Sequence, residues 1–516
     1  MAKANLDAII PREDFEVIDS QTSANYFNNI NITTLTGGLF YPFLRKPDFQ
    51  RETNEWEGKK IADFIDSFIN GELIPAIILW RNNSGLYFVI DGAHRLSALL
   101  CWIKDDYGDG EISKKFYGDS LNDEHREISE AIRKLINKKV GRYEDISKAT
   151  FAETPDAKLL QKAKNLGAFS IDVQWVNGDA QKAEKSFFKI NQQPSKIAPT
   201  EFKILESRKK ANCISARAII RGGEGHKYWS DFSAEVQSEI QTISKEIHEI
   251  LYNPILRTPV KTLDIPIGGK VMSAQSLPLI LEFVNMVNKV SPNFSTELDD
   301  DKSGAQTLQF LKNARKLAWR INSVHPSSLG LHPIVYFYSI DGKHKPASFY
   351  FTLAFVIELE KRNKFTNFIE VRENFEKFSL RYDYIIQQMT RKYRTGFSAI
   401  PYVVDFYMEL MNRLKINANL VDVLNEIIAL DKFNYLKVNN TIIEDREIFG
   451  NFTTETKSEV FIREALKNGL KCSICNGYIH RNSITIDHIQ RKQDGGQGNS
   501  ENGQLTHPYC NSTIKN

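Results

Sequence analysis

Two closely spaced pairs of metal-ligating residues lie near the C-terminus and restrict how that part of the chain can fold. Cys472 and Cys475 form the first pair, and His507 and Cys510 form the second, each with two residues between its members. This gap lets a tight turn present both side chains to one tetrahedral zinc ion. The segment is too short to bury enough apolar surface by itself, so zinc should be an integral part of its fold. We therefore predict a structural Zn²⁺ site made by these four residues.

The remaining cysteines do not suggest a disulfide framework. The chain has five cysteines, and three of them are in this tail. Cys101 and Cys213 lie far upstream in apolar or helical contexts that are typical of buried thiols. A zinc–thiolate site without disulfides is consistent with a reducing cytoplasm, which is the location that we expect. A zinc ribbon that only binds a partner is an alternative explanation of the ligand spacing.

Further polar residues lie between and after the two ligand pairs. Asp487 and His488 stand next to each other, and Asn502 and Asn511 follow at intervals. The whole pattern resembles the zinc-knuckled HNH (ββα-metal) nuclease family, in which the zinc is structural and a second metal takes part in cutting. A zinc ribbon that only binds a partner has no use for these additional residues, so we favour the nuclease interpretation.

Hydrolysis of a phosphodiester gives each of these residues an expected role. His488 is the natural general base, because an imidazole titrates near neutral pH. Asp487 points to the other side of the same strand and can hold Mg²⁺ or another divalent cation. The resemblance implies that Asn511 binds that metal or the phosphate, and that Asn502 orients the loop and the base; a turn-forming Asn502 is the alternative. His480 is expected at the surface or in contact with phosphate.

A second informative pattern lies near the N-terminus. We predict a helix over 56–70, strands over 74–80 and 86–90, and a further helix over 96–103. The second strand leads directly into Asp91-Gly92-Ala93-His94-Arg95. A strand–glycine–helix junction offers free backbone N–H groups and a positive helix end, which suits a phosphate. Arg95 and the upstream Arg51 add charge-assisted donors, and Asp91 can hold a metal or a water.

The order of these elements resembles the ParB/sulfiredoxin-like domain of the GmrS-type restriction family, over roughly residues 35–225. The family motif is Asp-Gly-Gln-Gln-Arg, and this chain has Ala93-His94 at the two central positions. The resemblance implies a nucleotide site, with ATP or GTP as the candidate ligand and hydrolysis as a candidate activity. The residues expected there are Gln50, Arg51, Asp91, Gly92, His94, Arg95 and Asn191.

Length and pattern together predict an α+β chain of several domains. A chain of 516 residues is too long for one hydrophobic core. We expect a ParB/sulfiredoxin-like sensor or nucleotide-binding domain over 1–225, a mainly helical domain over 226–455 and the HNH domain over 456–516. Helical periodicity is clearest in the middle region, over 233–252, 277–290, 308–321, 350–362 and 397–414.

Charge and hydropathy restrict the classes of partner. The net charge is only +3, so contact with DNA must come from local basic patches. The interval 372–394 mixes basic and aromatic residues and is a candidate nucleic-acid groove, with a solvated helical face as the alternative. No apolar run approaches the length of a membrane span, so we expect no membrane association.

These patterns predict a metal-dependent DNA endonuclease of a bacterial defence system. Its substrate is expected to be double-stranded DNA, modified or from phage, and its HNH domain is expected to be controlled by an N-terminal domain that binds nucleotide or senses the DNA. One HNH site per chain favours a homodimer for cutting both strands. The alternative is a ParB-like nucleic-acid-binding regulator with a zinc module that does not cut.

Overall fold

The structure is a computed structural model in which the chain divides into two compact units. Unit 1 comprises Met1–Ile214, Glu224–Phe232 and Leu298–Lys302, and unit 2 comprises Ser215–Gly223, Ser233–Glu297 and Ser303–Asn516. The residues that the structure describes are 3–15, 27–50, 52–54, 56–118, 121, 123–154, 156–192, 204–271, 273, 275–290, 298–438 and 451–514.

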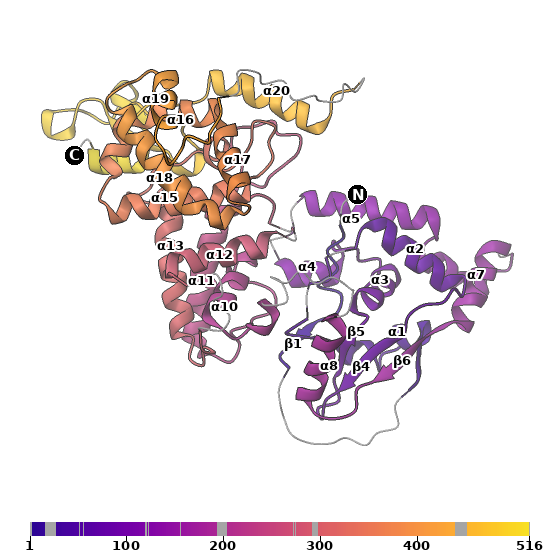
Figure 1. Cartoon of the computed structure of the whole chain (residues 1–516). Helices are drawn as coiled ribbons and strands as arrows, with labels where there is room; N and C mark the ends of the chain where they lie inside the picture. Colours follow the sequence, from indigo (N-terminus) through magenta and orange to yellow (C-terminus); the bar gives the residue numbers. More distant parts are fainter. Residues whose placement is uncertain are drawn as a thin grey trace. The chain divides into compact units, whose positions relative to one another are not determined.

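A mixed six-stranded sheet organises unit 1 (Figure 1). The strand order is β1-β3-β5-β4-β6-β2. β3 is parallel to β1 and β5, and β4 is parallel to β6, whereas β4 is antiparallel to β5 and β2 is antiparallel to β6. The strands are β1 (Arg12–Glu13), β2 (Asn29–Asn31), β3 (Leu44–Pro47), β4 (Ile77–Arg81), β5 (Tyr87–Asp91) and β6 (Ser170–Trp175).

Side-chain alternation places both faces of this sheet in hydrophobic cores. Successive residues of a strand point to opposite faces, and in β5 Val89 joins one core cluster while Phe88 and Ile90 join the other. The first cluster is covered by helices that include α2 and α3, and the second includes residues of α8. The helices of this region are α1 (Ile32–Thr36), α2 (Gly58–Ile69), α3 (Ala93–Lys104), α4 (Glu111–Tyr117), α5 (Asp123–Lys139), α6 (Tyr143–Lys148), α7 (Ala157–Ala168) and α8 (Ala180–Gln192).

A buried charged network fixes the loop that follows β3. Asp7 accepts hydrogen bonds from the Lys46 ammonium, the Arg12 guanidinium (3.0 Å) and the backbone N–H of Thr53 (3.1 Å). Lys46 is completely buried, and Arg12 also donates to the carbonyl of Gln50. Because buried charges are tolerated only when they are paired, this network holds Gln50 and Thr53 in place.

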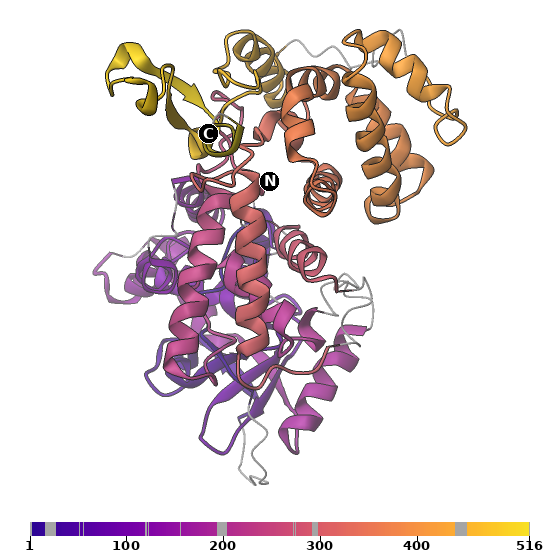
Figure 2. The same cartoon turned by 90° about the vertical axis from the view of Figure 1, so that its left-hand side faces the viewer.

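Unit 2 is mainly helical and ends in a small hairpin. α11 and α13 lie side by side as two long helices (Figure 2). Its helices are α11 (Ala234–Tyr252), α12 (Ser276–Asn288), α13 (Ala305–Ile321), α14 (Pro333–Tyr336), α15 (Pro346–Lys361), α16 (Phe365–Arg381), α17 (Asp383–Lys392), α18 (Gly396–Leu414), α19 (Leu420–Ile428) and α20 (Thr454–Lys467), with α10 (Ala211–Ile220) crossing the division between the units. The hairpin consists of β7 (Thr485–His488) and β8 (Gly503–Thr506), followed by a short π-helical turn, Cys510–Ile514.

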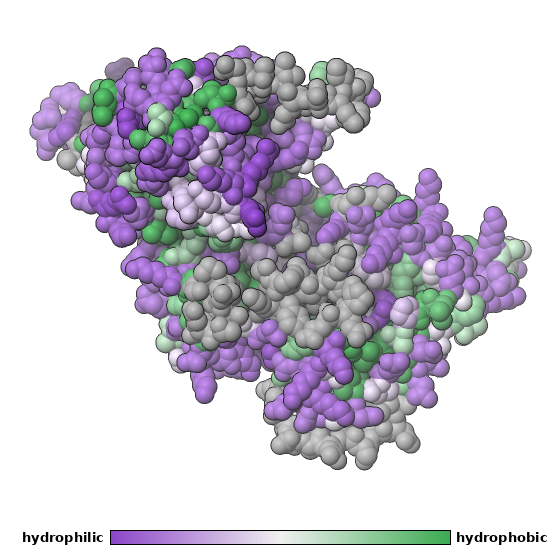
Figure 3. All heavy atoms as spheres, in the orientation of Figure 1, coloured by the Kyte–Doolittle hydropathy of each residue, from purple (hydrophilic) through white to green (hydrophobic). Residues whose placement is uncertain are grey.

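The predicted fold class is confirmed. The N-terminal region is a mixed sheet with helices on both faces, the middle is helical, and the chain ends in a small two-stranded sheet. The four N-terminal elements predicted from periodicity are present as α2, β4, β5 and α3. Within the described residues, no helix is long and apolar enough to cross a membrane. Hydrophilic side chains predominate on the face drawn in Figure 3, and apolar residues form scattered patches there.

The interval 372–394 does not form a groove along its whole length. Its first residue, Arg372, is completely buried and pairs with Glu376 at 2.7 Å, so it is unavailable to nucleic acid. The expectation was wrong for this residue because its ion-pair partner and its surroundings place it in the interior. For Arg381, Arg391, Lys392 and Arg394, which are exposed, nucleic-acid contact stays a prediction.

We predict that Asp7→Ala destabilises unit 1 strongly. The substitution leaves two buried cations without their shared carboxylate, which costs about 3–5 kcal/mol. Asp66→Ala is the control, because the contacts of Asp66 with Lys139 and Asn70 are partly exposed, and surface pairs contribute about 0–1 kcal/mol. Urea unfolding of the full chain measures both effects. Equal, small losses for the two variants would contradict the role of the network.

Candidate functional site

The four predicted zinc ligands come together in unit 2. Their ligand atoms all lie within 4.8 Å of one another, and all four side chains are buried. The first pair lies in a turn in which the N–H of Cys472 donates to the carbonyl of Gly477 (3.0 Å). The N–H of Ser473 donates to the carbonyl of Leu505 (3.0 Å), which attaches this turn to β8. The second pair follows β8 directly along the chain. The strand β8 therefore positions both pairs.

The orientation of His507 suits metal binding. Its Nδ1 lies 3.4 Å from the sulfur of Cys475, and its Nε2 lies 3.0 Å from the carbonyl oxygen of Tyr478. In this arrangement Nε2–H donates to the carbonyl and Nδ1 faces the sulfurs, as in many histidine zinc ligands whose other nitrogen is held by a backbone carbonyl. Burial lowers the pKa of His507, which keeps the imidazole neutral and able to donate its lone pair.

The three thiols share one small space. Hydrogen bonds from Cys475 and Cys510 lower the pKa of Cys472. The bond to Cys472 raises the pKa of Cys475 to about 11, and it also raises that of Cys510. Three thiolates at this separation therefore need a cation to ionise together, and Zn²⁺ provides that charge. Three sulfurs and one imidazole nitrogen match the donor set of a closed, structural zinc site.

The hairpin carries the two central residues of the predicted nuclease site. Asp487 pairs with Gln504 across the strands, and its carboxylate accepts a hydrogen bond from the side-chain amide of Gln504 (2.8 Å). His488 is the last residue of β7 and lies opposite Gly503. Because neighbouring strand residues point to opposite faces, the carboxylate of Asp487 is buried while His488 is half-buried.

Asn502 closes the loop between β7 and β8. Its side-chain oxygen accepts from the N–H of Gln490 (2.7 Å), and its amide donates to the carbonyls of Gln490 (3.1 Å) and Gln497 (2.8 Å). Its own carbonyl accepts from the N–H of Ile489 (2.8 Å), the residue after His488. Asn502 therefore fixes the backbone that follows His488, the residue predicted to be the general base.

Asn511 lies against β7 from the turn that follows the zinc ligands. Its amide donates to the carbonyl of Ile486 (3.3 Å) and to the hydroxyl of Thr485 (3.4 Å). These bonds place it beside the strand that carries Asp487. One carboxylate and one amide oxygen fit Mg²⁺, which commonly takes one or two protein carboxylates and completes its shell with water and substrate phosphate. Within the described residues, three or more His, Cys, Asp or Glu side chains lie close enough to hold a metal ion at one place, which is the Cys and His cluster.

The expectation for His480 was wrong. This side chain is completely buried, and its Nδ1 lies 3.1 Å from the side-chain amide of Asn322. Burial lowers the pKa of His480 to about 4. The residue is a neutral core histidine, because residues distant in the sequence, Asn322 and His332, pack against it.

A second site lies in unit 1, where most of the predicted phosphate-binding residues line one cavity. Its volume is about 210 Å³. Arg51 lies outside the described residues, and so does the side chain of Asn191 at the end of α8. Trp56, Lys60 and Phe187 line the cavity and were not predicted. The lining residues are Gln50, Trp56, Lys60, Ile90, Asp91, Gly92, Ala93, His94, Arg95 and Phe187.

The junction between β5 and α3 shapes this cavity. Gly92 has φ +98°, and a Cβ there would lie 2.9 Å from Ile77 Cγ1, so the turn requires glycine. Arg95 donates to the carboxylate of Asp91 (2.6 Å) and to the carbonyl of Ala76 (3.2 Å). These contacts hold the guanidinium beside the first turn of α3.

Two polar atoms of the cavity lining have no hydrogen-bond partner in the described part of the chain. They are the side-chain oxygen of Gln50, a residue only 6% exposed, and Nε of Arg95. Buried polar groups normally have partners, so an acceptor and a donor left open on one cavity indicate a polar ligand. The ring of Trp56 stacks on His94 (centroids 5.7 Å apart), and the Lys60 ammonium lies 4.7 Å from that ring. In the sequence Trp56 stands just before a helix, and this pattern does not indicate that its side chain lines a cavity.

Two protein families match the parts of the chain that contain these residues. The family described as "HNH endonuclease" matches residues 472–516, which contain the four zinc ligands and the hairpin. The family described as "GmrSD restriction endonuclease, N-terminal domain" matches residues 24–307, and this match extends beyond the predicted boundary at residue 225. No curated protein and no solved structure gives a significant match. Since the N-terminal match covers more than half of the 516 residues, the chain belongs to the GmrSD restriction endonuclease family, and it carries a C-terminal HNH endonuclease domain.

Proposed function

We propose that the chain cuts double-stranded DNA at the β7–β8 hairpin under the control of a nucleotide bound in unit 1. A restriction-type endonuclease acting on DNA follows from the two families. The observation that carries the residue assignment is that Asp487 and His488 end β7 and that Asn511, in the turn that follows the Cys and His cluster, bonds to the same strand.

The proposed chemistry divides among these three side chains. His488, whose side chain is half-buried at the end of β7, removes a proton from the attacking water. Asp487 and Asn511 hold the divalent cation, which supplies charge stabilisation to the phosphate and the leaving oxygen when it is bound. Asn502 does not touch the substrate in this proposal; it keeps the backbone after His488 in place.

The cavity of unit 1 is the proposed nucleotide site. Arg95 presents a donor toward a phosphate at the start of α3, where the helix dipole also favours an anion. The open acceptor of Gln50 suits a donor group of the ligand, such as a ribose hydroxyl or a base amine. ATP and GTP both offer these groups, so the choice between them and any hydrolysis belong to the proposal. Pairing of two chains would supply two HNH sites for cutting both strands.

We predict that His488→Ala lowers the rate of DNA cleavage by roughly 10²–10⁴-fold, the usual contribution of a general base. Its zinc content and thermal transition should match the wild type, because His488 is outside the zinc cluster. Plasmid nicking with Mg²⁺ measures the rate. Gln497→Ala is the control, since Asn502 contacts only the backbone carbonyl of this exposed residue. A fully active His488→Ala enzyme would remove His488 from the mechanism.

We predict that Arg95→Ala weakens nucleotide binding by about 1.5–3 kcal/mol, the scale of a hydrogen bond to a charged group. Calorimetric titration of the full chain with ATP, with GTP and with a short DNA duplex measures it. Arg142→Ala is the control, because Arg142 is an exposed arginine of the same unit that pairs with Glu144. Heat with the duplex alone would refute the nucleotide site and favour a DNA-sensing domain of the ParB type.

A further inference from the structure

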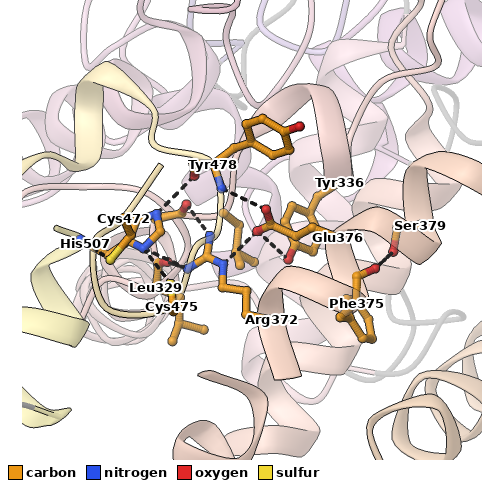
Figure 4. A network of polar contacts seen from close by, with 12 residues as sticks. Leu329, Tyr336, Arg372, Phe375, Glu376, Ser379, Cys472, Cys475, Tyr478 and His507 are labelled. Carbon is orange, nitrogen blue, oxygen red and sulfur yellow. Dashed lines mark hydrogen bonds and ion pairs between the residues drawn. The ribbon is translucent and has the colours of Figure 1, made fainter. Parts of the chain in front are cut away.

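We infer that the ion pair of Arg372 and Glu376 on α16 is part of the zinc centre and determines its affinity for the metal. This inference is independent of which DNA is cut and of whether a nucleotide binds. It assigns a positioning role to two residues of the helical region, about 100 residues before the first zinc ligand in the sequence (Figure 4).

Arg372 lies completely buried against the metal ligands. Its NH1 is 3.2 Å from Nδ1 of His507, and its NH2 donates to the carbonyl of Gly330 (2.8 Å). NH1 also donates to the carbonyl of Leu329, and Nε donates to Glu376 (2.7 Å). The guanidinium is therefore held in one orientation by backbone and carboxylate oxygens, with one edge toward the site that the metal would occupy. When zinc takes the lone pair of Nδ1, NH1 keeps its bond to the carbonyl of Leu329 and stays beside the ligand.

Glu376 and His507 hold the same residue of the zinc knuckle from both sides. Glu376 accepts from the backbone N–H of Tyr478 (2.8 Å), and Nε2–H of His507 donates to the carbonyl of Tyr478 (3.0 Å). Glu376 also accepts from the hydroxyl of Tyr336 (3.1 Å). A chain of hydrogen bonds thus runs from α16 through Tyr478 to a zinc ligand, and it sets the tautomer and the direction of that imidazole.

Charge gives a second reason for the arrangement. Zn²⁺ with three thiolates and a neutral imidazole carries a net charge of −1, and a buried charge without a partner is costly. Arg372 is a buried cation in contact with His507 on one side and with Glu376 on the other, so it separates the negative cluster from the buried carboxylate and attracts both where water is excluded. A guanidinium suits this task because it stays charged when buried and donates to several oxygens at once.

The knuckle is shaped to admit this arginine. A Cβ on Gly477 would lie 2.3 Å from Nε of Arg372, so a larger residue there forces the guanidinium away. Gly477 is not one of the glycines with a positive φ, so alanine can adopt its backbone conformation. Gly477→Ala is therefore a way to displace Arg372 without changing its charge.

The test is a chelator-competition measurement of zinc affinity on the full chain. Arg372→Met and Gly477→Ala should each lower the affinity roughly 10- to 100-fold, the usual effect of changing a residue that supports a metal ligand. Arg372→Lys should recover part of the loss, because lysine keeps the positive charge but lacks the several N–H donors of the planar guanidinium. Arg413→Met is the control, since Arg413 is a half-buried arginine that also pairs with a glutamate four residues away on its helix, Glu409.

A second measurement separates support of the metal from general stability. In the Co²⁺-substituted protein, Glu376→Gln should shift the visible absorption bands of the metal, because His507 loses its fixed direction. If Arg372→Met does not fold, Glu376→Gln and Gly477→Ala still decide the matter. Zinc affinities within twofold of the wild type in both, with unchanged cobalt spectra, would overturn the inference.

Discussion

The C-terminal part of this nuclease depends on the burial of three sulfurs and one imidazole in a space less than 5 Å across. Such a cluster is stable only with a cation at its centre and with every polar edge satisfied. Some of the groups around the cluster belong to the helical region: Arg372 contacts His507, and the carbonyl of Ser328 accepts from the N–H of Tyr509, which lies between His507 and Cys510. The zinc knuckle is therefore built onto helices of unit 2, and its ligands are held from outside as well as from within.

The same cluster fixes the hairpin that carries the proposed chemistry. The first pair of ligands is bonded to β8 through Ser473, and the second pair continues from β8 into the turn with Asn511. Asn511 in turn bonds to β7 beside Asp487. Short covalent and hydrogen-bonded paths thus connect the structural metal site to the residues proposed to hold the catalytic cation. This explains how a small sheet, which alone would be marginal, can hold side chains in defined places.

Features set by local sequence could be predicted, and those set by distant contacts could not. The two-residue ligand gaps and the strand–glycine–helix junction are short-range patterns, and both recur as expected around Cys472 and Gly92. His480 was misjudged because its partner, Asn322, is 158 residues away. The burial of Arg372 was missed for the same reason, since its contact with His507 spans 135 residues. Burial of a charge by a remote partner leaves no trace in spacing or periodicity.

The most direct test of the central claim is plasmid nicking by the purified full chain, with zinc content measured on the same sample and Mg²⁺ as the single variable. The account predicts one zinc per chain in both conditions and nicking only when Mg²⁺ is present. Stoichiometric zinc without cleavage under any divalent cation would contradict the nuclease assignment, and it would leave a zinc-supported DNA-binding protein.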